Sequence, residues 1–260
     1  MHDKESKMDY YSIKEFDDTG LVVTAFTSMG HGCWFSNDPN GHAGYREVAA
    51  HFGIRAEDMA ATFQRHSAVV REVTSKDSGM NVLWRNDPIE VADGVVTNER
   101  NFMISSMESD CTPVYILDPI KKAIGMVHSG WKGTLQNISI NAIELMGKLY
   151  GTLPADVMIA FGPCICKDCY EVGGDLRESF SSNYNEVELA RLFAPKSNGK
   201  FNLDIKEAIR ISLLKAGIQE KNIFDTDYCT YHSGLFYSHR LRAQQGLPTT
   251  ENMFTGIMLL

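Results

Sequence analysis

Residues 109–134 read SDCTPVYILDPIKKAIGMVHSGWKGT, and their pattern decides much of the fold. Two apolar segments, Pro113–Leu117 and Ala123–His128, have the β-branched and aromatic character that is typical of strands. Only a short polar connection separates them. A connection of this length makes an antiparallel hairpin and leaves no room for the helix that a parallel crossover needs. The pattern therefore argues against a purely parallel, doubly wound sheet.

The hairpin also predicts which side chains meet across its two strands. With a four-residue loop at 118–121, Leu117 pairs with Lys122, and the same register places Cys111 directly opposite His128. Their Cβ atoms would then lie about 4.5–5.5 Å apart. A loop one residue longer or shorter would turn the two side chains to opposite faces.

Strand and helix patterns continue on both sides of this hairpin without strict alternation. The further strands that we expect are Leu21–Thr27, Ser67–Val73, Val91–Thr97, Phe102–Ser105 and Val157–Phe161. The expected helices cover residues 43–52, residues 132–150, and a segment that Asp204 opens with Glu207 as a capping box and Gly217 closes. The pattern favours an α/β fold of mixed β-sheets with helices packed outside them. We expect a single domain over residues 13–260, preceded by a disordered tail over residues 1–12.

The composition excludes several classes of protein. The chain has 260 residues, with 25 Lys and Arg against 33 Asp and Glu, and its net charge of −8 disfavours a nucleic-acid-binding protein. No apolar stretch approaches the roughly 18 residues that cross a membrane, and the polar N-terminus does not resemble a secretory signal. Six cysteines are too few for a disulfide scaffold. We therefore expect a cytoplasmic protein with reduced thiols that contacts neither nucleic acid nor membrane.

The pair Cys111 and His128 is a candidate metal site. Zinc binds thiolate at about 2.3 Å and imidazole at about 2.0–2.1 Å, so one ion can bridge the two side chains. A catalytic zinc site needs a third protein ligand, and His66, just before the strand at Ser67, is the first choice. The other histidines weighed for that place are His31, His42, His51, His232 and His239.

The glycine-rich turn from Gly130 to Thr134 is a candidate anion site. Such a turn, entering a helix, offers free backbone N–H groups to a phosphate. Turn geometry alone explains Gly130 and Gly133 equally well. A tryptophan such as Trp131 is more often a core or rim residue than a surface on which a base stacks.

Several motifs resemble one known family. Ser109-Asp110-Cys111 with Pro113, followed by His128–Thr134, is similar to the "ADC-x-P … HAGWRGT" signature of bacterial proteins long called laccase-domain or multicopper polyphenol oxidoreductases. These proteins are now described as purine nucleoside phosphorylases that also deaminate adenosine. Further family motifs match in order at Gln64–His66, Ala92–Thr97, Gly162–Gly173, Asn202–Asp204, Cys229–Tyr231 and Phe236–Arg240.

This resemblance implies a single-domain, layered α/β/β/α fold and a zinc ion bound by His66, Cys111 and His128, which would also be the catalytic residues. The substrates that it implies are purine nucleosides such as adenosine and inosine, with phosphate for phosphorolysis and water for deamination. We assign Gln64, Trp131 and Arg240 to substrate contacts. The sequence does not indicate the oligomeric state.

Three other hypotheses remain open at this point. A copper polyphenol oxidase would match the older family name, and copper binds cysteine and imidazole well, but multicopper oxidation generally uses more histidines than the eight in this chain. A cysteine hydrolase acting on cell-wall precursors would use Cys111 as nucleophile and His128 as base. A binding module could hold a structural metal at Cys164-x-Cys166-x2-Cys169 and Cys229-x2-His232, although the simpler interpretation is reduced thiols beside one family cysteine.

Overall fold

The computed structural model describes residues 10–29, 41–84 and 90–260. Residues 1–9 of the predicted tail lie outside that part of the chain. The prediction is wrong for Tyr10 and Tyr11, which form strand β1 (Tyr10–Tyr11) and pair with Thr27 and Phe26. The reason is aromatic packing, because the Tyr11 ring stacks on that of Phe26 with 5.5 Å between their centroids.

The predicted hairpin is present, with a register two residues away from the expected one. Strand β7 (Thr112–Asp118) pairs antiparallel with β8 (Ala123–Ser129), and Asp118 lies opposite Ala123. The four-residue loop is therefore 119–122, because the Asp118 carboxylate accepts hydrogen bonds from the backbone N–H groups of Ile120 and Lys121 and so starts the turn inside the strand.

The shift of register changes the partner of His128 and keeps its face. His128 pairs with Pro113 rather than with Cys111. Continued by one residue beyond the ladder, this register brings Cys111 opposite Gly130. A shift of two leaves every side chain on its expected face, so Cys111 and His128 still lie on the same side of the sheet.

The hairpin forms the centre of a mixed six-stranded sheet. Its order is β13 (Ile223–Asp225), β9 (Met158–Phe161), β7, β8, β5 (Gly94–Thr97) and β4 (Val70–Glu72). The two outermost pairs are parallel and the other pairs are antiparallel. The expectation of mixed sheets is confirmed.

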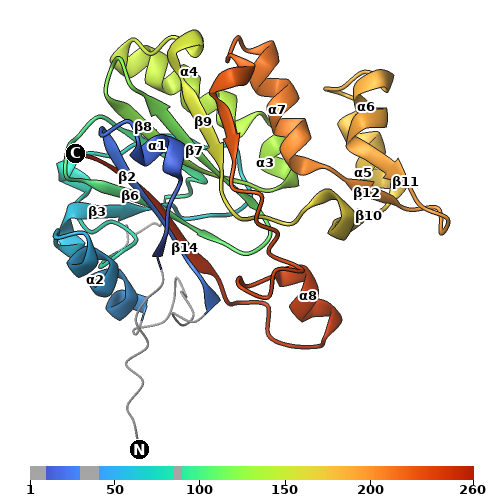
Figure 1. Cartoon of the computed structure of the whole chain (residues 1–260), viewed down its shortest axis with the longest axis horizontal. Helices are drawn as coiled ribbons and strands as arrows, with labels where there is room; N and C mark the ends of the chain where they lie inside the picture. The colour runs from blue at the N-terminus through green and yellow to red at the C-terminus, as the bar shows by residue number, and fades with distance from the viewer. Residues whose placement is uncertain (1–9, 30–40, 85–89) are drawn as a thin grey trace, which may run out of the picture.

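A second mixed sheet packs against the first. Its order is β1, β2 (Val22–Thr27), β14 (Met253–Leu259), β6 (Met103–Glu108) and β3 (Met59–Ala61). In Figure 1 the C-terminal strand β14 runs beside β2, so the two ends of the described chain share one sheet. Strand β14 is fully buried but was not among the strands expected from the sequence.

Alternating side chains explain the layers. Tyr115 and Leu117 of β7 belong to the core between the two sheets, together with Phe26 and Ile257 of the second sheet. Their neighbours in β7, such as Val114, belong to a core under the helices on the other face, because successive residues of a strand point to opposite faces. The observed fold is thus the expected single-domain α/β/β/α arrangement.

Helices cover the outer faces of both sheets. Helices α4 (Ile138–Tyr150) and α7 (Ile205–Lys215) lie on the six-stranded sheet, and α2 (Gly41–His51) lies on the five-stranded sheet. The Asp204 carboxylate caps α7 by accepting a hydrogen bond from the Glu207 N–H, as expected. The Glu207 side chain does not complete the expected capping box, because its carboxylate pairs with Arg191 and the Asp204 N–H donates to the Leu192 carbonyl.

The expected continuous helix over residues 132–150 is interrupted. It consists of α3 (Trp131–Leu135) and α4, separated at Asn137, whose φ of 57° is left-handed. Asparagine adopts this conformation more readily than most residues. The break ends α3 after five residues, and the apolar spacing alone did not reveal it because both pieces face the core.

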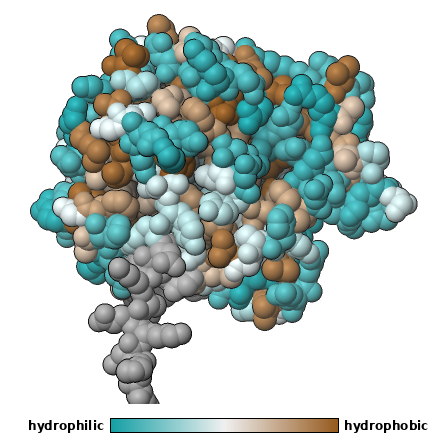
Figure 2. Space-filling view, viewed as in Figure 1, coloured by the Kyte–Doolittle hydropathy of each residue, from teal (hydrophilic) through white to brown (hydrophobic). Residues whose placement is uncertain are grey.

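The remaining elements form a smaller layer and the edges. A three-stranded sheet of β10 (Glu171–Val172), β12 (Phe201–Leu203) and β11 (Phe193–Pro195) lies beside α5 (Gly174–Phe180) and α6 (Glu186–Leu192). The short helices α1 (Lys14–Asp17) and α8 (His239–Gln244) complete the described elements. On the face shown in Figure 2, hydrophobic residues lie in small groups among hydrophilic ones. Within the described ranges, every helix is too short or too polar to cross a bilayer.

Candidate metal centre and cavity

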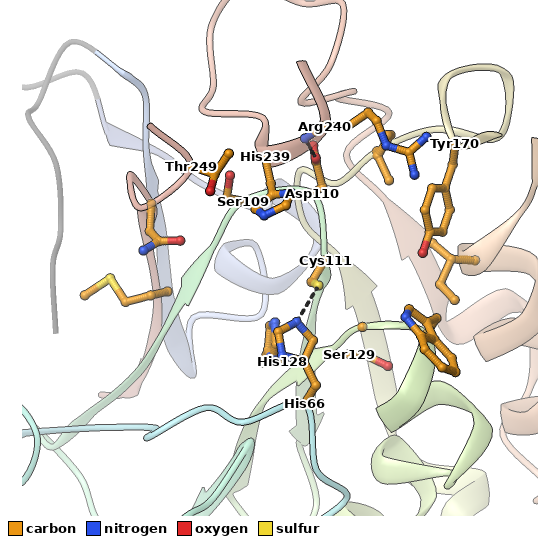
Figure 3. A pocket seen from close by; sticks show the side chains of 16 residues that line it. His66, Ser109, Asp110, Cys111, His128, Ser129, Tyr170, His239, Arg240 and Thr249 are labelled. Carbon is orange, nitrogen blue, oxygen red and sulfur yellow. Dashed lines mark hydrogen bonds between the residues drawn. The ribbon is translucent and has the colours of Figure 1, made fainter. Parts of the chain in front are cut away.

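Three of the predicted site residues meet although they come from separate parts of the chain. Cys111 lies just before β7, His128 lies near the end of β8, and His66 lies in the connection between β3 and β4. One ligand atom from each lies within 4.8 Å of the others. The Cys111 Sγ is 3.7 Å from the His66 Nε2, and the rings of His66 and His128 are 4.9 Å apart. The three side chains converge in Figure 3.

Gly130 leaves the space in which these side chains approach one another. A Cβ atom at this position would lie 2.9 Å from the Cys111 Sγ and 2.9 Å from the His66 Cδ2. Its backbone φ of −77° is ordinary for any residue. Glycine is therefore required here for room and not for conformation.

Asp93 organises both histidines from behind the cluster. Its carboxylate is fully buried and lies 2.9 Å from the His128 Nδ1, which leaves the His128 Nε2 to face the cluster. It also accepts hydrogen bonds from the backbone N–H groups of Arg65, His66 and Ser67. Burial alone would raise the pKa of Asp93, but the hydrogen bonds from His128, Ser67 and the backbone outweigh it and lower the pKa to about 2.

Glu108 adds a second buried carboxyl group at the cluster. Its Oε1 accepts a hydrogen bond from the Ser106 hydroxyl at 2.5 Å, and its Oε2 lies 3.8 Å from the His128 Nε2. That Oε2 has no hydrogen-bond partner among the described residues. Burial raises the pKa of Glu108 to about 7, against the opposing influence of His128. Burial disfavours the charged form of His128, but Glu108, Cys111 and Asp93 together hold its pKa well above the ordinary value.

Two residues of the site have left-handed backbones. The φ of His66 is 57° and that of Asp110 is 80°, a conformation that costs free energy for residues other than glycine and that concentrates at functional sites. Asp93 fixes the first through the His66 N–H. The Asp110 carboxylate is fixed by the Thr230 hydroxyl and, at 2.7 Å, by the Arg240 N–H.

A cavity of about 440 Å³ opens above the cluster. Trp131 and Tyr170 contribute aromatic rings to its wall, and His239 and Arg240 contribute groups that can donate hydrogen bonds. The Arg240 guanidinium donates to the Glu171 carbonyl at 2.7 Å and lies 5.4 Å from the centre of the Tyr170 ring. The volume of the cavity falls within the range of pockets that enclose small molecules, about 300–1,000 Å³.

Not every predicted residue lies in this cavity. Gln64 lines a neighbouring hollow and donates a hydrogen bond to the Met107 carbonyl at 2.6 Å. The glycine-rich turn is the N-terminus of the five-residue α3, where Thr134 donates from both its backbone N–H and its hydroxyl to the Gly130 carbonyl. An anion site in this turn stays a prediction.

The rival histidines lie elsewhere, except for His239. His31 falls outside the described residues, as does the side chain of His42. His51 packs against Tyr10, and His232 belongs to a second group of possible metal ligands with Cys166, Cys169 and Cys229.

Asp93, Glu108 and Tyr170 were not among the residues predicted from the sequence to form the site. A signal for the first two is present in the sequence, because each acidic residue interrupts or ends an apolar strand pattern, where burial demands a partner. Tyr170 follows the last cysteine of its motif and carries no comparable signal.

Comparison with known proteins identifies the family. The family model described as "Multi-copper polyphenol oxidoreductase laccase" matches residues 18–259. The chain therefore belongs to this family.

Two curated relatives carry enzyme names. The chain is 29% identical to "Purine nucleoside phosphorylase YlmD" of Bacillus subtilis over 194 residues, which is 74% of this chain and 69% of the relative. It is 27% identical to "Adenosine deaminase RL5" of an unknown prokaryotic organism, over 81% of this chain and 78% of the relative. Among solved structures, the hypothetical protein YfiH of Bacillus licheniformis has a TM-score of 0.85 and 25% identity, with 96% of each chain covered.

Proposed function

We propose that this protein is a zinc-dependent enzyme of purine nucleosides that splits adenosine- or inosine-type nucleosides with phosphate and deaminates adenosine. The observation that carries the proposal is the convergence of Cys111, His66 and His128 at one end of a cavity with aromatic walls and a guanidinium. The names of the two curated relatives support the substrate class.

The three side chains fit a zinc ion. Zinc bond lengths to thiolate and imidazole give a distance of about 3.6 Å between sulfur and nitrogen in a tetrahedral site, and the Cys111 Sγ lies 3.7 Å from the His66 Nε2. The buried Glu108 Oε2, which has no hydrogen-bond partner within the described ranges, lies 3.8 Å from the His128 Nε2 beside them. Three protein ligands leave a fourth position open, as in catalytic zinc sites.

Residues of the chain prepare this site in definite ways. Asp93 holds the His128 ring so that Nδ1 faces the carboxylate and Nε2 points at the cluster, where a zinc ion would take the place of the Nε2 proton. The same carboxylate holds the His66 backbone in its left-handed conformation. The Glu108 carboxyl, with its pKa raised to about 7 by burial, can hold or release a proton at Oε2 near neutral pH.

Zinc bound at these residues supplies a Lewis acid. In deamination, the oxygen of water bonds to the ring carbon that bears the amine, and ammonia leaves. In phosphorolysis, a phosphate oxygen bonds to the sugar C1′ while the bond from C1′ to the base breaks. In both reactions the purine ring must be held in a fixed orientation. The aromatic rings of Trp131 and Tyr170 in the cavity wall offer apolar faces on which it can stack. Gln64 would contact the substrate only from the neighbouring hollow.

Phosphate needs a cation, and we assign this role to Arg240. Its guanidinium uses one N–H on the Glu171 carbonyl, which fixes its position and leaves further N–H groups for an anion. The Asp110 carboxylate accepts a hydrogen bond from the Arg240 backbone and so places the residue at the cavity.

The test is to incubate the purified protein with adenosine and with inosine, with and without phosphate, and to identify the products by mass. We expect free base and ribose 1-phosphate only when phosphate is present, and inosine from adenosine in its absence. Cys111→Ala is expected to lose the metal bound at this site and both activities while remaining folded. His51→Ala, at a histidine that packs on Tyr10, is the matched control and is expected to retain both.

Other outcomes would favour the alternative hypotheses. Turnover that survives removal of the metal by a chelator but not alkylation of Cys111 would support a cysteine hydrolase. Dioxygen uptake with a polyphenol and stoichiometric copper would support the activity in the family's older name. Near wild-type turnover of nucleosides by Cys111→Ala would contradict the proposed site.

A further inference from the structure

A second group of metal-binding side chains lies outside the three residues described above. Cys166, Cys169, Cys229 and His232 each offer one ligand atom, and all four atoms lie within 4.8 Å of one another. The Cys169 Sγ lies 3.3 Å from the His232 Nδ1, and the Cys166 Sγ lies 3.8 Å from it. We propose that these four residues form a closed structural zinc site.

The distances suit a tetrahedral ion. Zinc bond lengths predict about 3.6 Å between sulfur and nitrogen ligands, and the two measured distances lie on either side of this value. Three thiols and one imidazole are one of the usual sets of structural zinc ligands. Thiolates are poor ligands for magnesium and calcium, which prefer oxygen.

The spacing of the ligands is that of two short metal-binding turns. Cys166 and Cys169 are separated by two residues, as are Cys229 and His232. The backbone N–H groups of Cys169 and Tyr170 both donate to the Cys166 carbonyl, which closes the first turn. In the second, the Ser233 N–H donates to the Cys229 carbonyl.

The two turns are held against each other by the chain itself. Cys164 and Cys229 form an isolated parallel bridge. The Cys166 N–H also points at the Cys229 Sγ at 3.4 Å, and hydrogen bonds to sulfur ligands are among the contacts by which a protein tunes a metal site. Cys164 is fully buried and is not one of the four ligands, so the close spacing of Cys164 and Cys166 does not count against the site.

This site differs from the one at Cys111 because it offers four protein ligands instead of three. With four protein ligands no position remains for substrate, which is typical of structural zinc. His232 is exposed and Cys229 is buried, so the ion would lie just under the surface and could be loaded from solvent.

The position of the site indicates that it stabilises part of the cavity wall. Tyr170 follows Cys169 directly, and Thr230, next to Cys229, donates to the Asp110 carboxylate that also binds the Arg240 N–H. A zinc ion here would join two segments about 60 residues apart in the sequence. The first contributes Tyr170 to the wall of the cavity, and the second holds Asp110, which also lines the cavity, through the Thr230 hydroxyl. The site would therefore fix that wall.

The test counts metal in the purified full-length chain after zinc loading and removal of free zinc, by elemental analysis and native mass spectrometry. We expect two zinc ions per wild-type chain and one in His232→Ala. His232→Cys, which offers a fourth thiolate, is expected to restore the second ion. Cys111→Ala is expected to lose only the other ion, and His51→Ala is expected to keep both.

Cobalt gives a second readout, which identifies the ligands of each bound ion and not only the number of ions. Cobalt-loaded Cys111→Ala would show a strong thiolate-to-metal charge-transfer absorption from three sulfurs, whereas loaded His232→Ala would show the weaker absorption of a single-thiolate site. Either a wild-type chain with one zinc that His232→Ala retains, or a chain with the mass of a Cys166–Cys169 disulfide that does not bind zinc there after reduction, would overturn the proposal. The proposal is independent of the activity at Cys111, because its readouts do not require turnover.

Discussion

Replacing Gly130 by alanine isolates the geometry of the Cys111 cluster from the stability of the fold. The backbone of Gly130 has φ −77° and ψ 175°, which alanine adopts without strain. The added methyl group would point into the space between Cys111 and His66. The substitution therefore changes the spacing of two proposed ligands and little else.

The size of the effect follows from the distances. The new Cβ would lie 2.9 Å from both the Cys111 Sγ and the His66 Cδ2, whereas ordinary contacts begin at 3.4 Å. At least one ligand must then move by about half an ångström. Metal sites tolerate roughly 0.2 Å in bond length, and disturbing the groups that orient ligands costs roughly 10- to 100-fold in metal affinity. We expect a loss in this range or larger.

The assay is zinc affinity by competition with a chelating dye, together with nucleoside turnover at saturating zinc. Gly174→Ala is the matched control, because Gly174 begins α5 and the nearest atom to its new Cβ would be 3.8 Å away. We expect the control to match the wild type and the thermal unfolding of Gly130→Ala to change by only a few degrees. Wild-type zinc affinity and turnover in Gly130→Ala would refute the reasoning, because the methyl group cannot fit without displacing a ligand.

Two further substitutions probe the groups around the cluster. Asp93→Asn replaces an acceptor oxygen with a donor against several N–H groups, and each buried donor without a partner costs about 1–3 kcal/mol. Since each kcal/mol lowers the melting temperature of a chain of this size by roughly 2–4 °C, we expect calorimetry to show a fall of several degrees, and an unchanged melting temperature would argue against the Asp93 network. Arg240→Gln removes the cation assigned to phosphate, and charged hydrogen bonds contribute about 1.5–3 kcal/mol, so the KM for phosphate should rise roughly tenfold or more while deamination without phosphate changes little. An equal loss in both reactions would show that Arg240 acts on the nucleoside or on the fold instead.

The hairpin illustrates how far local patterns reach. Apolar runs and a short polar connection predicted β7, β8 and the face shared by Cys111 and His128, because strand periodicity and loop parity are local properties. The register itself depended on whether Asp118 belongs to the loop or to the strand. Its carboxylate caps the turn from within the strand, a choice that the residue types leave open.

The edges of the sheets were predicted less well. Strand β14 has a continuous apolar pattern but no partner near it in sequence, since it pairs with β2 and β6. The small sheet of β10, β11 and β12 has strands of two or three residues, which are too short to show a period. Both failures concern pairing at long range, which periodicity does not encode.

His66, the third proposed ligand, shows where inference from local sequence patterns ends and inference from the fold begins. His66 is 45 residues from Cys111 in sequence, and neither spacing nor propensity distinguishes it from the other histidines. Its place just before an expected strand made it the first choice, and the family resemblance implied it as well. The fold brings it to Cys111 because the Asp93 carboxylate, directly before β5, accepts hydrogen bonds from the N–H groups of residues 65–67 and lies against the His128 ring. A buried acid with that many donors is what joins the loop to the hairpin. The physical signal in the sequence was therefore the charged residue inside an apolar strand pattern, because such a residue needs buried donors and here collects them from the loop and from the hairpin.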